Sequence, residues 1–419
     1  TPGGSCSSST SFRLHGRTCV ATLRKYMRRP LSARATRVPL LCTRICYAQT
    51  TRRSLCGFVR SEEQTRSARS GLRVAMGSDP PGDLPDPFAL VSSQLRPLDG
   101  SLRELVGSDN PVLTRVAQHF FELQGKRFRP TVVLLASAAA NGGSPANTRQ
   151  GRLAEITEMI HAASLLHDDV IDLADSRRGA RAAHRIYGNK VAVLAGDFLL
   201  ARASVLLSRL RDVRVVELLA TTIEEMVHGE LMQVKASPQE LLDFEHYLSK
   251  TYRKTAALIS LSCQASAMLG GHPPRVELAL QGYGRHLGIA YQLVDDILDC
   301  TGSVGTLGKP ALSDMQQGLA TAPTLFAAEE FPQADDSSRA PHPPAAPALS
   351  RAPFLSFPNT HSLAASRRHG LQVAKIVQRR FSKEGDAAAV SEFVARSGGL
   401  QRARELASSH AQQARTARD

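Results

Sequence analysis

The residues best suited to chemistry are three aspartates in the segment 167–172, HDDVID. On a helix, Asp168 and Asp172 share one face because they are four positions apart, while Asp169 lies about 100° around the axis. Carboxylates this close repel one another, and burial among apolar neighbours raises their pKa values unless cations neutralise them. A solvated helix face would normally carry lysine or arginine, but residues 156–166 contain neither. The segment therefore indicates a site that holds cations.

A second cluster, residues 292–299 (QLVDDILD), repeats this pattern 127 positions after the first. Asp295 and Asp299 are again four residues apart, and Asp296 follows the first of them. One such cluster could be a solvated helix end, but two matching clusters in apolar surroundings weaken that explanation. Carboxylate oxygens suit Mg²⁺, which prefers one or two carboxylates together with phosphate oxygens of a substrate. We therefore predict Mg²⁺ bridged to a diphosphate.

Basic residues flank both clusters, as the binding of a diphosphate requires. Three of them lie in the segment 125–130 (GKRFRP), and the others are Arg177, Arg178, Lys250, Lys254 and Lys309. Arginine offers a fork of donors for phosphate, whereas lysine acts as a point charge. Each of these residues alone would more often be an ordinary surface charge, so their significance depends on their position beside the acidic helices.

Several motifs, in this order, resemble the trans-prenyltransferases, the all-trans polyprenyl diphosphate synthases. They are GKRFRP, HDDVID followed by DSRRG, AVLAGDFLLARA, KTYRKTAALI, and QLVDDILD followed by GK. The stretches MVHGELMQ and DMQQGLATAPTLFAAEEFPQ look closest to the solanesyl diphosphate synthases of plants and algae. The resemblance covers about residues 86–333 and 371–415. It implies an all-α bundle around a deep central cavity, working as a homodimer.

The resemblance also implies roles for individual residues. The metal-binding aspartate motifs are matched by Asp168, Asp169, Asp172, Asp295, Asp296 and Asp299. Positions that bind isopentenyl diphosphate are matched by Lys126, Arg129, His161 and Arg178. An allylic-diphosphate contact is matched by Arg177, and further substrate contacts by Lys254, Thr255, Gln292 and Lys309. Residues 179–184 (GARAAH) depart from the commoner form of this loop, and no role is inferred for them.

The reaction implied is repeated ionisation, condensation and elimination with isopentenyl diphosphate. Metal ions and cationic side chains stabilise the departing diphosphate, and a dry cavity protects the allylic carbocation from water. Ala163 and Ser164, about one turn before Asp168, are small, which favours a long product. A length of about C45 rests on the resemblance alone.

Other functions fit the sequence less well. The serious alternative is a geranylgeranyl diphosphate synthase, whose product is shorter. A class I terpene cyclase normally mixes Asn, Ser or Thr with Glu in its second site, and a non-catalytic partner subunit should have lost one cluster. Both aspartate clusters are intact in this chain.

Long helices are needed to position these residues. Hydrophobic periodicity predicts helices at about 148–172, 191–210, 213–234, 238–269 and 276–299, with Asn110-Pro111 starting an earlier one. Aromatic residues are only 5% of the chain and Trp is absent, so we predict a Leu/Ala/Val-rich core in one all-α domain, residues 86–415. No uninterrupted apolar run reaches the roughly 18 residues of a membrane span, so we expect at most a peripheral membrane contact for product release.

The formal charge of +14 is concentrated at the start of the chain. Residues 1–75 contain 15 of the 52 Lys and Arg residues and two of the 38 acidic residues, so 37 basic and 36 acidic residues remain. This near-neutral remainder argues against nucleic-acid binding. The Arg- and Ser-rich residues 1–76 are typical of an organelle transit peptide, with a plastid favoured over a mitochondrion. Translated upstream sequence is the other explanation.

Residues 334–370 interrupt the helical pattern. They contain six prolines and show no helical period, which predicts a disordered insertion within the 86–415 domain. It is either a lineage-specific loop or an intron retained in the gene model. We expect it to have no catalytic role, because every candidate metal or diphosphate ligand precedes it.

Overall fold

The computed structural model describes residues 86–417 apart from 123–124, 126, 302–311 and 331–371. The predicted leader and insertion lie outside these residues, as do the predicted substrate contacts Lys126 and Lys309. All described residues belong to one structural unit.

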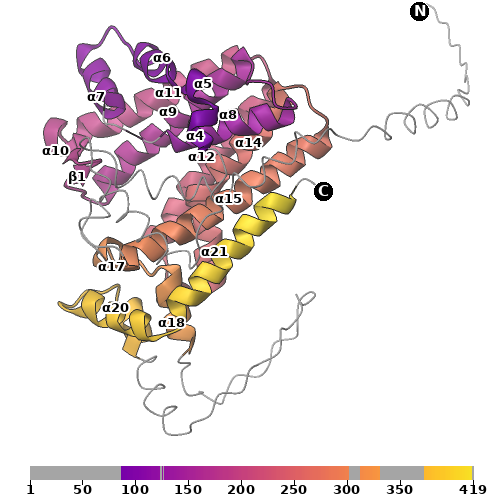
Figure 1. The fold of residues 1–419 in the computed structure, drawn as a ribbon. Helices are drawn as coiled ribbons and strands as arrows, with labels where there is room; N and C mark the ends of the chain where they lie inside the picture. Colours follow the sequence, from indigo (N-terminus) through magenta and orange to yellow (C-terminus); the bar gives the residue numbers. More distant parts are fainter. Residues whose placement is uncertain (1–85, 123–124, 126, 302–311, 331–371, 418–419) are drawn as a thin grey trace, which may run out of the picture. The chain divides into compact units, whose positions relative to one another are not determined.

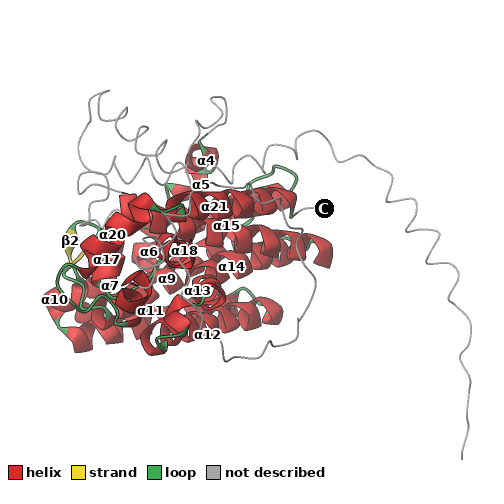
Figure 2. Cartoon of the chain, turned by 90° about the horizontal axis from the view of Figure 1, so that it is seen from below, coloured by secondary structure: helices red, strands yellow, loops and turns green. Residues whose placement is uncertain are grey.

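Helices make up almost all of the described part, which confirms the predicted all-α class (Figures 1 and 2). The first half contains α4 (Pro87–Leu90), α5 (Ser92–Leu95), α6 (Leu98–Leu105), α7 (Pro111–Glu122), α8 (Phe128–Ala140), α9 (Thr148–Ile171), α10 (Ala183–Tyr187), α11 (Asn189–Arg209) and α12 (Val213–Lys235). The second half contains η2 (Glu240–Leu242), α13 (Phe244–Thr251), η3 (Tyr252–Ala256), α14 (Ala257–Leu269), α15 (Pro274–Thr301), α17 (Ser313–Gln316), α18 (Ala322–Glu330), α20 (Asp386–Arg396) and α21 (Gly399–Thr416).

Helix α9 is the central helix that carries the first aspartate cluster. Its start is fixed by a capping box in which Asn147 and Gln150 each accept a hydrogen bond from the other's backbone N–H, both at 2.9 Å. It packs against α11, α8 and α14, and its buried residues lie on all sides, as expected of a core helix. Because the helix ends at Ile171, Asp168 and Asp169 lie in its last turn and Asp172 is its C-cap residue.

Helix α15 carries the second aspartate cluster and lies between α14 and α21 (Figure 1). Its approach to α14 and η3 is too close for any side chain at two positions. A Cβ at Gly288 would lie 2.5 Å from Ala256 Cα, and a Cβ at Gly284 would lie 2.7 Å from Ser260 Cα. This close packing fixes the position of α15 relative to η3, and both elements contribute residues to the site described below.

The predicted helix over residues 238–269 ends at Leu269 as expected, but its predicted start is wrong and a π-helical turn modifies its course. Asp243 is extended, and its side chain accepts a hydrogen bond from Glu245 N at 3.0 Å, so α13 begins here rather than at Pro238. Residues 252–256 then form η3, a π-helical turn. Such turns insert one extra residue and occur frequently at functional sites. At Gly229 of α12, a Cβ would lie 2.8 Å from Lys254 N, so this glycine makes room for the turn.

A two-stranded hairpin follows the first aspartate cluster, which the sequence did not predict. Strands β1 (Ser176–Arg177) and β2 (Ala180–Arg181) pair antiparallel, with Arg177 opposite Ala180. The turn uses Arg178 and Gly179 at positive φ, 53° and 81°. The hairpin fixes where the two arginines after the cluster lie.

Helix α11 is, by length and composition, apolar enough to cross a membrane, with a mean hydropathy of 1.8 over an 18-residue window. It contains no uninterrupted apolar run of the length of a membrane span, because Asp197 and Arg202 interrupt it. It packs along α9 and buries Leu199, Ala203 and Leu207. Its apolar character is therefore partly explained by its place in the bundle.

Candidate active site

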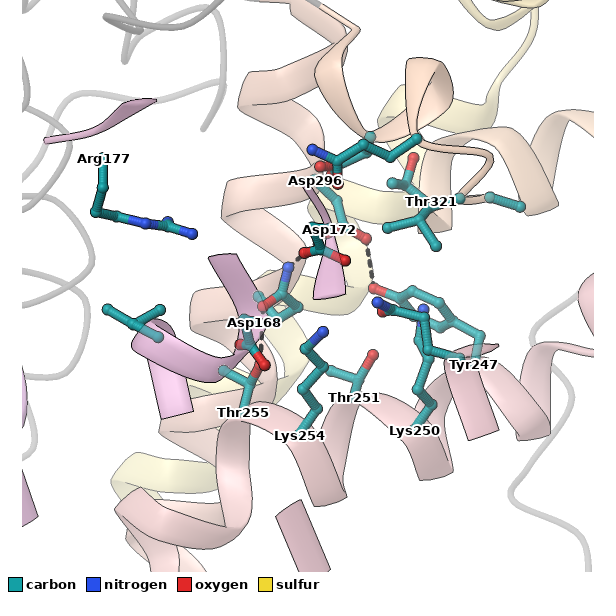
Figure 3. A pocket seen from close by; sticks show the side chains of 17 residues that line it. Asp168, Asp172, Arg177, Tyr247, Lys250, Thr251, Lys254, Thr255, Asp296 and Thr321 are labelled. Carbon is teal, nitrogen blue, oxygen red and sulfur yellow. Dashed lines mark hydrogen bonds between the residues drawn. The ribbon is translucent and has the colours of Figure 1, made fainter. Parts of the chain in front are cut away.

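One pocket of about 200 Å³ brings together residues of both aspartate clusters with Lys250 of α13 and Lys254 of η3 (Figure 3). The residues used below that line it are Leu165, Asp168, Asp172, Arg177, Tyr247, Lys250, Lys254, Thr255, Gln292, Asp296 and Asp314. The side chains of Lys250 and Lys254 project from the continuous helical segment α13–η3 towards the aspartate carboxylates of the pocket (Figure 3). The pocket is thus a polar site with charges of both signs.

The first cluster contributes Asp168 and Asp172, as predicted from their spacing. Burial raises the pKa of Asp168 to about 6, although Lys254 opposes the shift. Burial raises the pKa of Asp172 as well. Lys254 forms an ion pair with Glu230 of α12, with an Nζ to Oε2 distance of 2.5 Å. Burial lowers the pKa of Lys254, but Asp168 and Glu230 outweigh this and raise it.

Asp169 does not line this pocket, unlike its two neighbours. It is buried and forms an ion pair with Arg177, whose Nε donates to Oδ1 at 2.8 Å. Arg177 therefore pairs with the Asp169 carboxylate in this structure, and the metal-binding role of Asp169 stays a prediction. The physical reason is the 100° rotation between consecutive helix positions, which turns Asp169 towards the hairpin.

In the second cluster, Asp296 lines the pocket but is already surrounded by donors. It accepts hydrogen bonds from Tyr247 Oη at 2.6 Å, Gln292 Nε2 at 2.9 Å and Ala322 N at 3.1 Å. Burial raises its pKa, and these hydrogen bonds oppose the increase. Asp299 accepts from the backbone N–H groups of Ser313 and Asp314, at 3.1 and 3.2 Å. Both side chains thus connect α15 to later elements.

Asp295 is half-buried on α15 and does not line the pocket. Across the described residues, no group of three or more His, Cys, Asp or Glu side chains is arranged to hold a metal ion. Both clusters therefore contribute carboxylates to one pocket, and the metal-binding role of Asp295 and Asp299 stays a prediction.

Two predicted substrate contacts lie in the pocket beside Asp296. Thr255 Oγ1 donates to Gln292 Oε1 at 3.0 Å, and the amide of Gln292 then donates to Asp296. The π-turn places Thr255 on the same side as Lys254 (Figure 3). The structure therefore brings together these predicted residues from η3 and α15.

A second cationic cluster lies at the start of α8. Arg129 Nη1 is 2.8 Å from His161 Nε2, and the Arg178 guanidinium lies 5.0 Å from the Phe120 ring centroid. Burial, followed by the charge of Arg129, holds the pKa of His161 well below its usual range, so the ring is neutral. The buried Nε of Arg129 has no hydrogen-bond partner within the described part of the chain. Arg129, His161 and Arg178 are three of the predicted isopentenyl-diphosphate contacts, and the structure groups them.

Arg127, the middle basic residue of GKRFRP, has a structural role instead. It has a positive φ of 49°, donates to Glu158 Oε1 at 3.0 Å and to Phe121 O at 3.0 Å, and pairs with Asp99 at 2.6 Å. Residue type alone could not separate it from its basic neighbours, whereas the family resemblance assigned roles only to Lys126 and Arg129. In the sequence, its buried partner Glu158 is simply an acidic residue in an apolar helix, and nothing there indicated the ion pair.

The residues predicted to set chain length do not line the pocket. Ala163 is fully buried in the main core, and Ser164 Oγ donates to His161 O at 3.0 Å. Leu165 lines the pocket instead. The deep apolar cavity and the role of these two positions therefore stay predictions. Sequence reasoning also missed Tyr247, which carried no pattern that distinguished it from a core aromatic.

The family profile described as polyprenyl synthetase matches residues 110–340. The chain is 49% identical over 264 residues to solanesyl-diphosphate synthase 1, mitochondrial, of Oryza sativa subsp. japonica, covering 59% of this chain and 61% of that protein. It is 48% identical over 264 residues to solanesyl diphosphate synthase 3, chloroplastic/mitochondrial, of Arabidopsis thaliana, covering 59% and 63%. Each match thus spans less than two thirds of the relative's length. A probable hexaprenyl pyrophosphate synthase, mitochondrial, of Neurospora crassa is 41% identical over 379 residues, covering 78% and 76%.

Solved structures show the same fold. The polyprenyl synthase of Caulobacter crescentus, complexed with calcium and isoprenyl diphosphate, has a TM-score of 0.66 at 31% identity, covering 79% of this chain and 90% of that one. The apo form of an Arabidopsis medium/long-chain length prenyl pyrophosphate synthase has a TM-score of 0.56 at 38% identity, with the same two coverages of 79% and 90%.

Proposed function

The chain belongs to the polyprenyl synthetase family, and we propose that it is an all-trans polyprenyl diphosphate synthase. It would condense isopentenyl diphosphate repeatedly onto an allylic diphosphate. The observation that carries the proposal is the pocket that joins Asp168 and Asp172 to Lys254, Thr255 and Gln292. Relatives named solanesyl and hexaprenyl synthases support a long product.

The charges that line the pocket fit a divalent cation. Its carboxylates are Asp168, Asp172, Asp296 and Asp314, and its cations are Arg177, Lys250 and Lys254. A diphosphate anion would be repelled by this set unless further positive charge accompanied it. Mg²⁺ bound there would neutralise the diphosphate and stabilise it as a leaving group. We propose Asp168 and Asp172 as ligands, with Asp295 as the candidate from the second cluster.

In the proposed mechanism the two cationic groups hold different substrates. Lys254 and Arg177 bind the allylic diphosphate, and they stabilise negative charge as its carbon–oxygen bond breaks. Arg129, His161 and Arg178 hold isopentenyl diphosphate, whose double bond attacks the allylic carbocation. A proton then leaves the new chain for the departing diphosphate. Because His161 is neutral, it can donate a hydrogen bond to an oxygen of the bound anion without adding charge.

The proposed product is solanesyl diphosphate, about C45, which would serve as the side chain of plastoquinone or ubiquinone. A geranylgeranyl diphosphate synthase is the second candidate. Incubation with labelled isopentenyl diphosphate and farnesyl or geranylgeranyl primer separates them, because the dephosphorylated products differ in chromatographic mobility. Products that stop at C20 would contradict the long-chain proposal.

We also propose a homodimer. Apolar side chains lie exposed on two neighbouring helices, Val193, Leu194 and Val205 on α11 and Val213, Val227, Leu231 and Val234 on α12. Exposed apolar groups of this kind mark interaction surfaces. Sedimentation equilibrium of the purified chain tests the proposal, and a monomer at micromolar concentration would contradict it.

The proposed domain organisation is one catalytic domain, residues 86–415, preceded by an import leader, residues 1–76, and interrupted by the insertion 334–370. A plastid destination is proposed, with the mitochondrion as the alternative. Relatives named as mitochondrial and as chloroplastic/mitochondrial support an organelle. Fusion of residues 1–76 to a fluorescent protein tests the leader, and a cytosolic signal would contradict it.

A further inference from the structure

A lysine of α13, Lys250, lines the pocket but has no part in the mechanism above. It lies one turn before Lys254, so both project from the same side of the helical run (Figure 3). The two lysines differ in their partners. Lys254 is paired with Glu230, whereas within the described residues no carboxylate forms an ion pair with Lys250. Burial lowers the pKa of Lys250, so an anion beside it would favour its charged form.

The contact that holds Lys250 is the ring of Tyr247, whose centroid lies 5.5 Å from Nζ. This ring is itself fixed. Its hydroxyl donates to Asp296 at 2.6 Å, and its face packs against Phe244 with centroids 5.5 Å apart. Phe244 in turn packs against Phe326 of α18 at 4.6 Å. Tyr247 is therefore a rigid platform anchored on α15 and α18, and the cation–π contact keeps the ammonium group at the pocket wall.

We propose that Lys250 is a further binding residue for the allylic diphosphate, and that Tyr247, anchored by Asp296, positions it. This inference rests on the proposed function, because it assigns a residue to the same diphosphate. It also gives Asp296 a task other than metal binding. With Oδ1 and Oδ2 both engaged by donors, Asp296 connects the second aspartate cluster to the platform that holds the lysine.

The test uses the full chain and inorganic pyrophosphate with Mg²⁺ as a probe, measured by calorimetry, beside steady-state kinetics. Lys250→Met should weaken pyrophosphate binding and raise the KM of the allylic substrate, each about tenfold or more, which corresponds to one lost charge-assisted contact. The KM of isopentenyl diphosphate should stay within about twofold, because its proposed contacts lie elsewhere. Lys375→Met, an exposed lysine outside the pocket, is the matched control.

Two further variants separate binding from packing. Lys250→Arg keeps the charge and should retain pyrophosphate affinity within about threefold. Tyr247→Phe keeps the ring but loses the bond to Asp296, and should weaken pyrophosphate binding about threefold, again without affecting isopentenyl diphosphate.

Three results would overturn the inference: unchanged pyrophosphate affinity in Lys250→Met, an equal loss in Lys250→Arg, or a loss confined to isopentenyl diphosphate. Failure of the proposed function would look different. In that case the wild-type chain would make no prenyl product, while the pyrophosphate measurements would still decide the role of Lys250.

Discussion

Replacing Asp168 with asparagine should stabilise the metal-free protein while removing its activity. Burial raises the pKa of this carboxyl from its ordinary 3.8 to about 6 in the folded protein. The folded state therefore holds the proton more tightly than the unfolded state does. Below about pH 4 both states are protonated and nothing is lost, whereas the destabilisation grows between about pH 4 and pH 6 and is complete above that range. Two pKa units correspond to roughly 3 kcal/mol, and asparagine, which cannot ionise, avoids this penalty.

Urea unfolding in EDTA measures the effect directly. At pH 8 Asp168→Asn should be more stable than wild type by roughly 2–3 kcal/mol, and at pH 5 the gain should shrink to about half of that. Asp109→Asn, at an exposed aspartate, is the control and should change stability by less than about 0.5 kcal/mol. With Mg²⁺ and both substrates, the Asp168 variant should lose turnover by orders of magnitude. An Asp168→Asn protein less stable than wild type in EDTA at pH 8 would refute the reasoning.

Two other predictions concern backbone packing and product length. Gly229→Ala should lower the free energy of unfolding by about 1–3 kcal/mol and reduce turnover, because the new Cβ would lie 2.8 Å from Lys254 N and displace the π-turn. Thermal unfolding measures the loss of stability, and kcat measures the loss of turnover. Unchanged stability and kcat would contradict this prediction. Ser164→Phe should shorten the product while the first condensation continues, since Ser164 is half-buried, and unaltered product lengths would show that the growing chain does not pass it. Phe at the fully buried Ala163 should instead destabilise the core by about 1–3 kcal/mol.

The long helices could be predicted because their signals are local. Asn110 caps α7 because its Oδ1 accepts hydrogen bonds from Val112 N and Leu113 N, and the helix predicted over 148–172 agrees with α9. The late start of the predicted 238–269 helix depends on the Asp243 cap, and its π-turn lies against the close approach of Gly229. The approach involves residues 25 positions apart, so periodicity within one segment could not reveal it.

The candidate site was predictable in its residue types but less so in its geometry. Spacing correctly placed Asp168 and Asp172 on one face. It could not show that Asp169 would meet Arg177 of an unpredicted hairpin, or that Asp296 would meet Tyr247, 49 positions earlier. A helical pattern specifies which side chains share a face, whereas the groups opposite that face are set by tertiary packing.

The most direct test of the account is a turnover measurement on the purified chain with labelled isopentenyl diphosphate and an allylic primer, with Mg²⁺ and with EDTA. The account predicts all-trans diphosphate products extended by several five-carbon units in Mg²⁺, and none in EDTA. The same assay on Asp172→Asn, the second proposed ligand in the pocket, should give orders of magnitude less product. Condensation that persists in EDTA, or a cyclised hydrocarbon in place of a linear diphosphate, would contradict it.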